Sequence, residues 1–184
     1  AVAKCTVIND SSELATLYLG AVAVPRIKGS YGGETDRYDP ATGLAYCFRG
    51  DEAAYAGLVL LSQTPYSYKA LDWNVYSPAD PNSDAATDST RYHQTADPAF
   101  GPEVVAGGDG SIYSLNAGPV TLAPHDSVVV VYGIVFGASF NEMAAAAEAA
   151  QPAYSLKIAE NPQTTNFESG QIGVRVSGAA TIRL

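Results

Sequence analysis

Two histidines are the side chains that could act as a general base near neutral pH, His93 in a polar stretch and His125 after Pro124. A hydrolase also needs a nucleophile and an orienting group, or a metal-bound water. The sequence has neither a G-x-S-x-G elbow nor an H-E-x-x-H motif. Paired carboxylates among the 19 acidic residues stay open as an alternative, although these acids gather in turns. We therefore predict no catalytic residue and interpret the protein as a non-enzyme.

An acidic segment has the spacing of a calcium loop. Asp80, Asn82 and Asp84, followed by Asp88, form a D-x-[DN]-x-D pattern whose alternate side chains can direct oxygen atoms at one hard cation. The EF-hand pattern fails beyond this point because Ala85 stands where the turn needs glycine. We predict an isolated calcium loop as the one cofactor site, with a solvated acidic loop as the alternative.

Four aromatic residues lie close together in sequence: Tyr66, Tyr68, Trp73 and Tyr76. Exposed aromatic rings can stack on the apolar C–H faces of sugars, so these four are candidate ligand-binding residues for a polysaccharide. Packing in the core or at an interface is the alternative, because apolar residues stand two positions away on each side of Trp73.

The two cysteines, Cys5 and Cys47, form no C-x-x-C pair and no cluster with histidine, which excludes a zinc or thioredoxin-like site. We predict a Cys5–Cys47 disulfide, with two buried free thiols as the alternative. The chain begins at Ala1 without methionine, so we expect a removed secretory signal and an extracellular or cell-surface location.

The composition limits the classes of partner. The chain has 184 residues, with 10 basic and 19 acidic residues, so its net charge is −9. An acidic protein is a poor match for nucleic acid or for an anionic membrane surface. The longest apolar stretch, residues 127–136, falls short of the ~18 residues that cross a bilayer, so no membrane insertion is expected.

Short β-branched and aromatic segments, separated by Gly, Pro, Asn and Asp, dominate the chain and predict strands. So many short strands predict an all-β fold, a two-sheet antiparallel β-sandwich of the jelly-roll or immunoglobulin-like kind. We assign residues 1–158 to the sandwich and residues 159–184 to a C-terminal strand tail that pairs with the sandwich or with a neighbouring subunit. The expected strands are residues 4–8, 15–24, 43–48, 56–62, 71–75, 111–115, 120–122, 127–136, 171–176 and 180–184.

One short helix is expected after the last long strand. Ser139 and Glu142 form an S-x-x-E capping box, and an alanine-rich run follows it. Pro152 is predicted to end this helix after about three turns. Its small side chains would let it lie close against a sheet.

Three segments, residues 117–128, 135–137 and 149–154, resemble a β-sandwich module found near the C-terminus of secreted and surface proteins of Bacteroidetes-type bacteria. The pattern of that module reads GPFTLAPGDS, then AxVxG, then AAQxxY. His125 replaces the usual turn glycine of the first segment. The resemblance implies a secreted β-sandwich and says little about activity.

The tail, residues 160–184, is similar to the opening strands of the C-terminal sorting domains used by type IX secretion. This similarity implies export across the outer membrane. Asp88-Ser89-Thr90 resembles the short O-glycosylation acceptor of the same secreted proteins, as does Asp126-Ser127-Val128. We predict Ser89 as the acceptor, because Ser127 stands at the start of a predicted strand.

These features favour a non-catalytic extracellular structural protein that self-assembles into a filament or array. The apolar ends, residues 1–8 and 171–184, are suited to strand exchange between copies of the chain, and the 12 tyrosines suit partly hydrated interfaces. The alternative is a carbohydrate-binding or targeting accessory module of a larger secreted enzyme. The expected partners are therefore other copies of the chain, or a polysaccharide.

Overall fold

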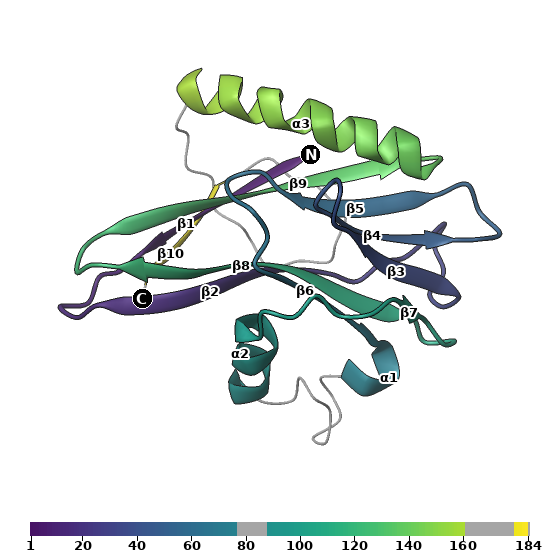
Figure 1. The fold of residues 1–184 in the computed structure, drawn as a ribbon, viewed down its shortest axis with the longest axis horizontal. Helices are drawn as coiled ribbons and strands as arrows, with labels where there is room; N and C mark the ends of the chain where they lie inside the picture. Colours follow the sequence, from purple (N-terminus) through teal and green to yellow (C-terminus); the bar gives the residue numbers. More distant parts are fainter. Residues whose placement is uncertain (77–87, 161–178, 184) are drawn as a thin grey trace.

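The computed structural model describes residues 1–76, 88–160 and 179–183. Two β-sheets pack face to face, and helices cover the outer face of each sheet (Figure 1). The sheets are antiparallel except for one parallel pair at an edge. The predicted all-β two-sheet sandwich is confirmed.

The larger sheet has seven strands in the order β10-β1-β9-β5-β4-β3-β7. The sequence did not predict β3. Its residues are mostly polar or charged, so it lacks the alternation of apolar and polar residues that indicates a strand. Its strands are β1 (Val2–Ile8), β3 (Glu34–Asp39), β4 (Leu44–Arg49), β5 (Tyr55–Leu60), β7 (Val104–Val105), β9 (Ser127–Gly137) and β10 (Ala179–Arg183).

The smaller sheet has three strands in the order β2-β8-β6: β2 (Ala15–Ala23), β8 (Ser111–Leu122) and β6 (Ser67–Asp72). β8 joins into one strand the two segments expected at residues 111–115 and 120–122. The strand expected at residues 71–75 is wrong beyond Asp72, where the chain turns into the short helix α1 (Trp73–Tyr76).

Alternating side chains divide the interior into two apolar cores. On β8, Tyr113 and Leu115 face the larger sheet and fill the core between the sheets. A second core lies between the larger sheet and the helix α3 (Phe140–Glu160), where Met143 is fully buried. A side chain at Gly57 would bring its Cβ 3.0 Å from the Met143 sulfur, so this glycine lets α3 approach the sheet closely.

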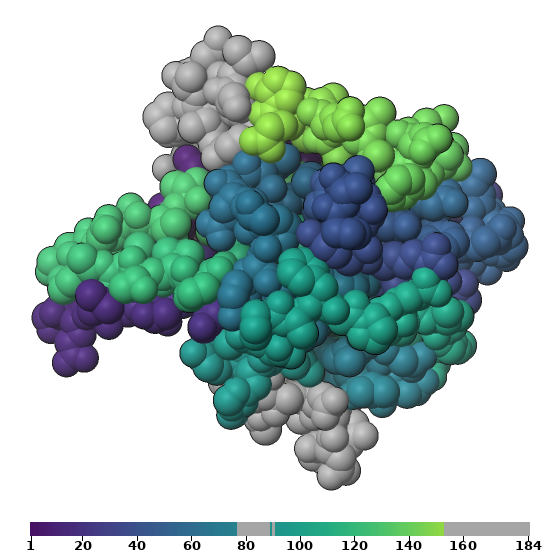
Figure 2. Space-filling view, in the orientation of Figure 1, coloured from purple at the N-terminus to yellow at the C-terminus, as the bar shows by residue number. Residues whose placement is uncertain are grey.

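The helix α3 begins at the predicted capping box, where the Glu142 N–H donates to the Ser139 hydroxyl. The prediction that Pro152 ends this helix is wrong, because α3 continues through Pro152 to Glu160. A proline removes one helical hydrogen bond. The packing of the alanine-rich face on β9 and β5 stabilises α3 and offsets this loss. Figure 2 shows α3 as a yellow-green ridge along one side of the molecule.

The predicted disulfide is not formed, and both cysteines are free thiols. Cys5 on β1 and Cys47 on β4 lie in the same sheet, with β9 and β5 between them. Three strand spacings amount to about 14 Å, whereas a disulfide needs Cα atoms within about 7 Å. The register displaces them further, because Cys5 is level with Val130 of β9 and Cys47 is level with Phe136.

The described end of the tail lies in the larger sheet. β10 pairs in parallel with β1, from Lys4 opposite Ala179 to Ile8 opposite Arg183. β1 therefore has a partner on each side, β9 and β10. The strand expected at residues 171–176 lies outside the described residues.

The turn from β8 to β9 gives His125 an unusual backbone. Its φ is 62°, in the left-handed region that favours glycine. The buried side chain of Asn9 fixes this turn by donating to the carbonyl oxygens of Leu122 and Ala123. The structure thus has a left-handed residue at the position where the resembling module usually carries glycine.

We expect His125→Gly to raise the free energy of unfolding by about 0.5–1 kcal/mol, because glycine adopts this φ without a Cβ clash. Urea denaturation of both proteins measures the difference. Ala123→Gly is the matched control in the same turn, where φ is not positive, and it should lower stability. Equal destabilisation by both substitutions would contradict the expectation.

Candidate functional site

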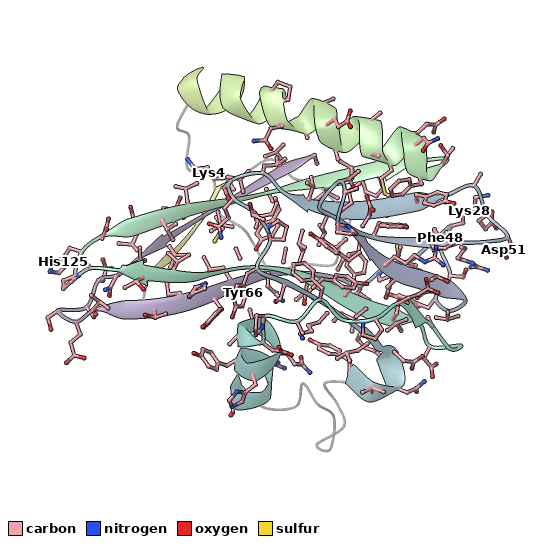
Figure 3. All side chains as sticks on the ribbon, viewed as in Figure 1. Lys4, Lys28, Phe48, Asp51, Tyr66 and His125 are labelled. Atoms are coloured by element: carbon pink, nitrogen blue, oxygen red, sulfur yellow. The ribbon has the colours of Figure 1, made fainter. Side chains whose placement is uncertain are left out.

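The histidines lie in two separate places. His93 is in the last turn of the helix α2 (Asp88–Ala96), where its ring contacts Tyr92. Figure 3 places His125 at one extreme of the molecule, in the exposed β8–β9 turn. Within residues 1–76, 88–160 and 179–183, no three His, Cys, Asp or Glu side chains come together as metal ligands.

Most of the predicted calcium segment lies outside the described residues. Asp80, Asn82 and Asp84 are not among them. Asp88 is the first residue of α2. Ser89 is exposed on the first turn of that helix, so a modifying enzyme could reach it. Calcium binding by this segment and glycosylation of Ser89 stay predictions.

The four predicted aromatic residues do not form one surface. Tyr68 is fully buried and stacks on Tyr38, with 5.7 Å between ring centroids. Tyr66 is half-buried between β6 and α2, and its hydroxyl donates to the Ala96 carbonyl over 3.0 Å (Figure 3). Trp73 packs on Tyr76, with their ring centroids 5.7 Å apart. Of these four residues, Tyr76 lines a pocket.

This pocket, of about 170 Å³, lies on the outer face of the three-stranded sheet, and residues of α1 and α2 line it. Figure 1 shows both helices on that side of the sheet. Because side chains alternate along a strand, the residues between the core positions form its floor. The floor residues are Tyr18, Gly20 and Val22 of β2, Ile112, Ser114 and Asn116 of β8, and Lys69 and Leu71 of β6. The walls are Tyr76 of α1 and Arg91, Gln94 and Thr95 of α2.

Gly20 and Asn116 shape the floor together. A Cβ at Gly20 would lie 2.5 Å from the Asn116 amide oxygen, so only glycine leaves room for this amide. The amide nitrogen of Asn116 donates to the Ser67 hydroxyl over 3.0 Å. Its oxygen is buried and has no hydrogen-bond partner among the described residues. A buried acceptor without a partner costs about 1–3 kcal/mol.

Tyrosine rings border this floor. Tyr18 packs against Tyr66 with 5.3 Å between centroids, and Tyr92 meets Tyr18 edge to face at 5.8 Å. The Tyr92 side chain is 53% exposed. Tyr18 lies in the strand expected at residues 15–24 but was not predicted as a site residue, although its outward position follows from the alternation along β2.

The charged lining residues in the described part of the pocket are both basic, Lys69 and Arg91. The Lys69 ammonium pairs with Asp97, and this hydrogen bond lowers the pKa of the Asp97 carboxyl. The lining therefore combines aromatic rings, hydroxyls and amides with two cations, in a protein whose net charge is −9.

Comparisons with known proteins find no matching family model, no matching curated protein and no matching solved structure. The resemblance to the secreted β-sandwich module therefore stays a prediction. Among the helices of the described residues, none is both long and apolar enough to cross a bilayer.

We expect Gly20→Ala to lower the free energy of unfolding by about 1–3 kcal/mol, because its methyl group would collide with the Asn116 amide. Thermal or urea unfolding measures the change. Gly50→Ala is the matched control, since a Cβ at Gly50 meets no atom within 4 Å and should change stability by less than about 0.5 kcal/mol. Equal stability of the two variants would show that the floor tolerates a side chain.

Proposed function

We propose that the protein binds carbohydrate in the pocket on the outer face of the three-stranded sheet. The observation that carries the proposal is the meeting of Tyr18 and Tyr76 with the polar side chains of Gln94, Thr95 and Ser114 in one pocket. Tyrosine rings offer flat apolar faces to the C–H groups of a sugar, and hydroxyl and amide side chains can donate to and accept from sugar hydroxyls.

The size of the pocket supports a small binding unit. Its volume of about 170 Å³ is below the ~300–1,000 Å³ typical of sites for drug-sized ligands. Such a volume suits one sugar residue, either a chain end or a side branch. Ser114, Gln94 and Thr95 add groups that both donate and accept hydrogen bonds, as sugar hydroxyls require.

Binding without hydrolysis fits this lining better than glycoside cleavage. Glycosidases use two carboxyl groups that flank the scissile bond, in most families. The described lining residues include no aspartate and no glutamate. The proposed setting is extracellular. There such a module would attach a larger secreted enzyme, or a cell surface, to the polysaccharide that the module binds.

We expect Tyr76→Ala to weaken carbohydrate binding about 10-fold or more, because the wall ring is lost. A glycan array identifies the ligand, and titration of Trp73 fluorescence then measures the affinity, since Trp73 contacts Tyr76. Tyr31→Ala is the matched control, because Tyr31 is 51% exposed and packs on Arg26 instead. If no glycan binds the unmodified protein, or if both variants bind as it does, the proposal fails.

Self-assembly by strand exchange is the second candidate. It is supported by β10, which occupies the edge of the larger sheet and pairs with β1 through five residue positions. The same pairing could form between two copies, with β10 of one copy placed on β1 of the next. This route requires β10 to leave its own sheet, because the described ends of the chain pair within one molecule.

We expect strand exchange, where it operates, to be abolished by the double substitution Ala180→Pro with Thr181→Pro. Neighbouring residues of a strand direct their N–H groups to opposite sides, so one of these prolines removes a bond to β1. Gel filtration over a range of concentrations should give oligomers for the unmodified chain and monomers for the variant. Ala180→Val with Thr181→Val is the control that keeps the strand. A chain that stays monomeric at every concentration excludes this candidate.

A further inference from the structure

Two carboxylates lie inside the sandwich, on the inner face of β3. Glu34 and Asp36 are both fully buried. They are two positions apart on one strand, so their side chains project from the same face with Cβ atoms about 7 Å apart. Burial of a carboxylate without a compensating charge costs several kcal/mol.

Ser111 of β8 brings the two carboxylates into one cluster. One oxygen of Glu34 accepts from the Ser111 backbone N–H over 3.0 Å and from its hydroxyl over 3.3 Å. The Ser111 side chain also lowers the pKa of Asp36, against the larger, opposite effect of burial. Both acids are therefore within reach of one hydroxyl.

Four oxygen atoms of this cluster have no hydrogen-bond partner among the described residues. They are the second carboxylate oxygen of Glu34, both carboxylate oxygens of Asp36 and the hydroxyl of Tyr68. Tyr68 is fully buried, and its pKa is raised first by burial and then by the nearby charge of Asp36. Four unsatisfied buried oxygens of this kind require a donor or a cation.

No side-chain cation of the described residues supplies that charge. The ion pairs join Lys28 to Glu52, Arg37 to Glu103, Arg49 to Asp51 and Lys69 to Asp97, and none reaches Glu34 or Asp36. Cys47 lies nearby on β4, but burial strongly raises the pKa of its thiol, so it stays neutral. Within the described part of the chain, no cation therefore compensates the negative charge of the cluster.

We propose that Glu34 and Asp36 bind one calcium ion inside the sandwich, with the hydroxyls of Tyr68 and Ser111 as further oxygen ligands. Two carboxylates match the charge of a divalent cation. Calcium accepts six to eight oxygen ligands in a flexible arrangement, whereas magnesium needs near-ideal octahedral geometry and retains several waters. The donor set holds oxygen atoms alone, which does not favour zinc.

A glycine-rich turn gives the site a route to solvent. The backbone of Gly110 lies against Glu34, since a Cβ there would be 2.8 Å from the Glu34 carboxylate. Gly107, Gly108 and Asp109 of the same turn are exposed. Opening of this short turn would uncover Glu34 without unfolding either sheet.

The experiment measures thermal unfolding of the full chain at pH 8, in EDTA and in millimolar calcium chloride. We expect calcium to raise the Tm by about 5–10 °C when it reaches 100 times its Kd. In equilibrium dialysis at pH 8, Asp36→Asn and Glu34→Gln should each remove one bound calcium ion per chain.

The variants separate this cluster from the acidic segment near α2. Asp36→Asn should raise the Tm in EDTA at pH 8, since no charge is buried, so it is expected to fold. Asp109→Asn, in the exposed turn, and Asp80→Asn with Asp84→Asn should keep the calcium response. If Asp36→Asn keeps the response, or if the unmodified chain does not respond to calcium, the cluster holds a proton or water and the proposal is overturned.

Discussion

The alternation of side chains along β8 is the constraint on which the rest of the structure depends. Tyr113 and Leu115 point into the core between the sheets, so Ser114 and Asn116 must point to the opposite face. The helices α1 and α2 cover part of that second face. The pocket is the space that these helices do not fill. The same strand also carries Ser111, which donates to the buried carboxylate of Glu34, so one strand supports core, pocket and acid cluster.

Much of the fold could be predicted from local patterns. Period-two alternation and turn residues predicted most strands and the sandwich class, and the capping box placed the start of α3 correctly. The predicted ends of helices and strands were wrong where tertiary packing outweighed the local preference of the sequence. Pro152 does not end α3, because the helix is docked on the sheet before the proline is reached. The short helix α2 has no apolar stripe that would predict it, since its sequence is mostly polar.

The candidate sites were harder to predict, for physical reasons that particular residues show. Tyr76 was identified, but Asn116 fell between two predicted strands that are one, so its outward orientation could not be derived. Glu34 and Asp36 were missed because alternating acids normally indicate a solvated face, whereas here that face is the interior. The prediction of a Cys5–Cys47 disulfide was wrong, because the separation of two residues in sequence does not tell how many strands lie between them in a sheet.

The place of β1 in the larger sheet also dictates the order in which the protein can fold. Its neighbours are β9 and β10, which come from residues 127–137 and 179–183. An emerging chain on the ribosome therefore carries β1 without a partner until most of the sequence has been synthesised. Contacts of such long sequence separation slow folding, and an unpaired apolar strand invites association with other chains in the meantime. Chaperone protection during synthesis is consequently of more value to this protein than to one whose first strand pairs with its second.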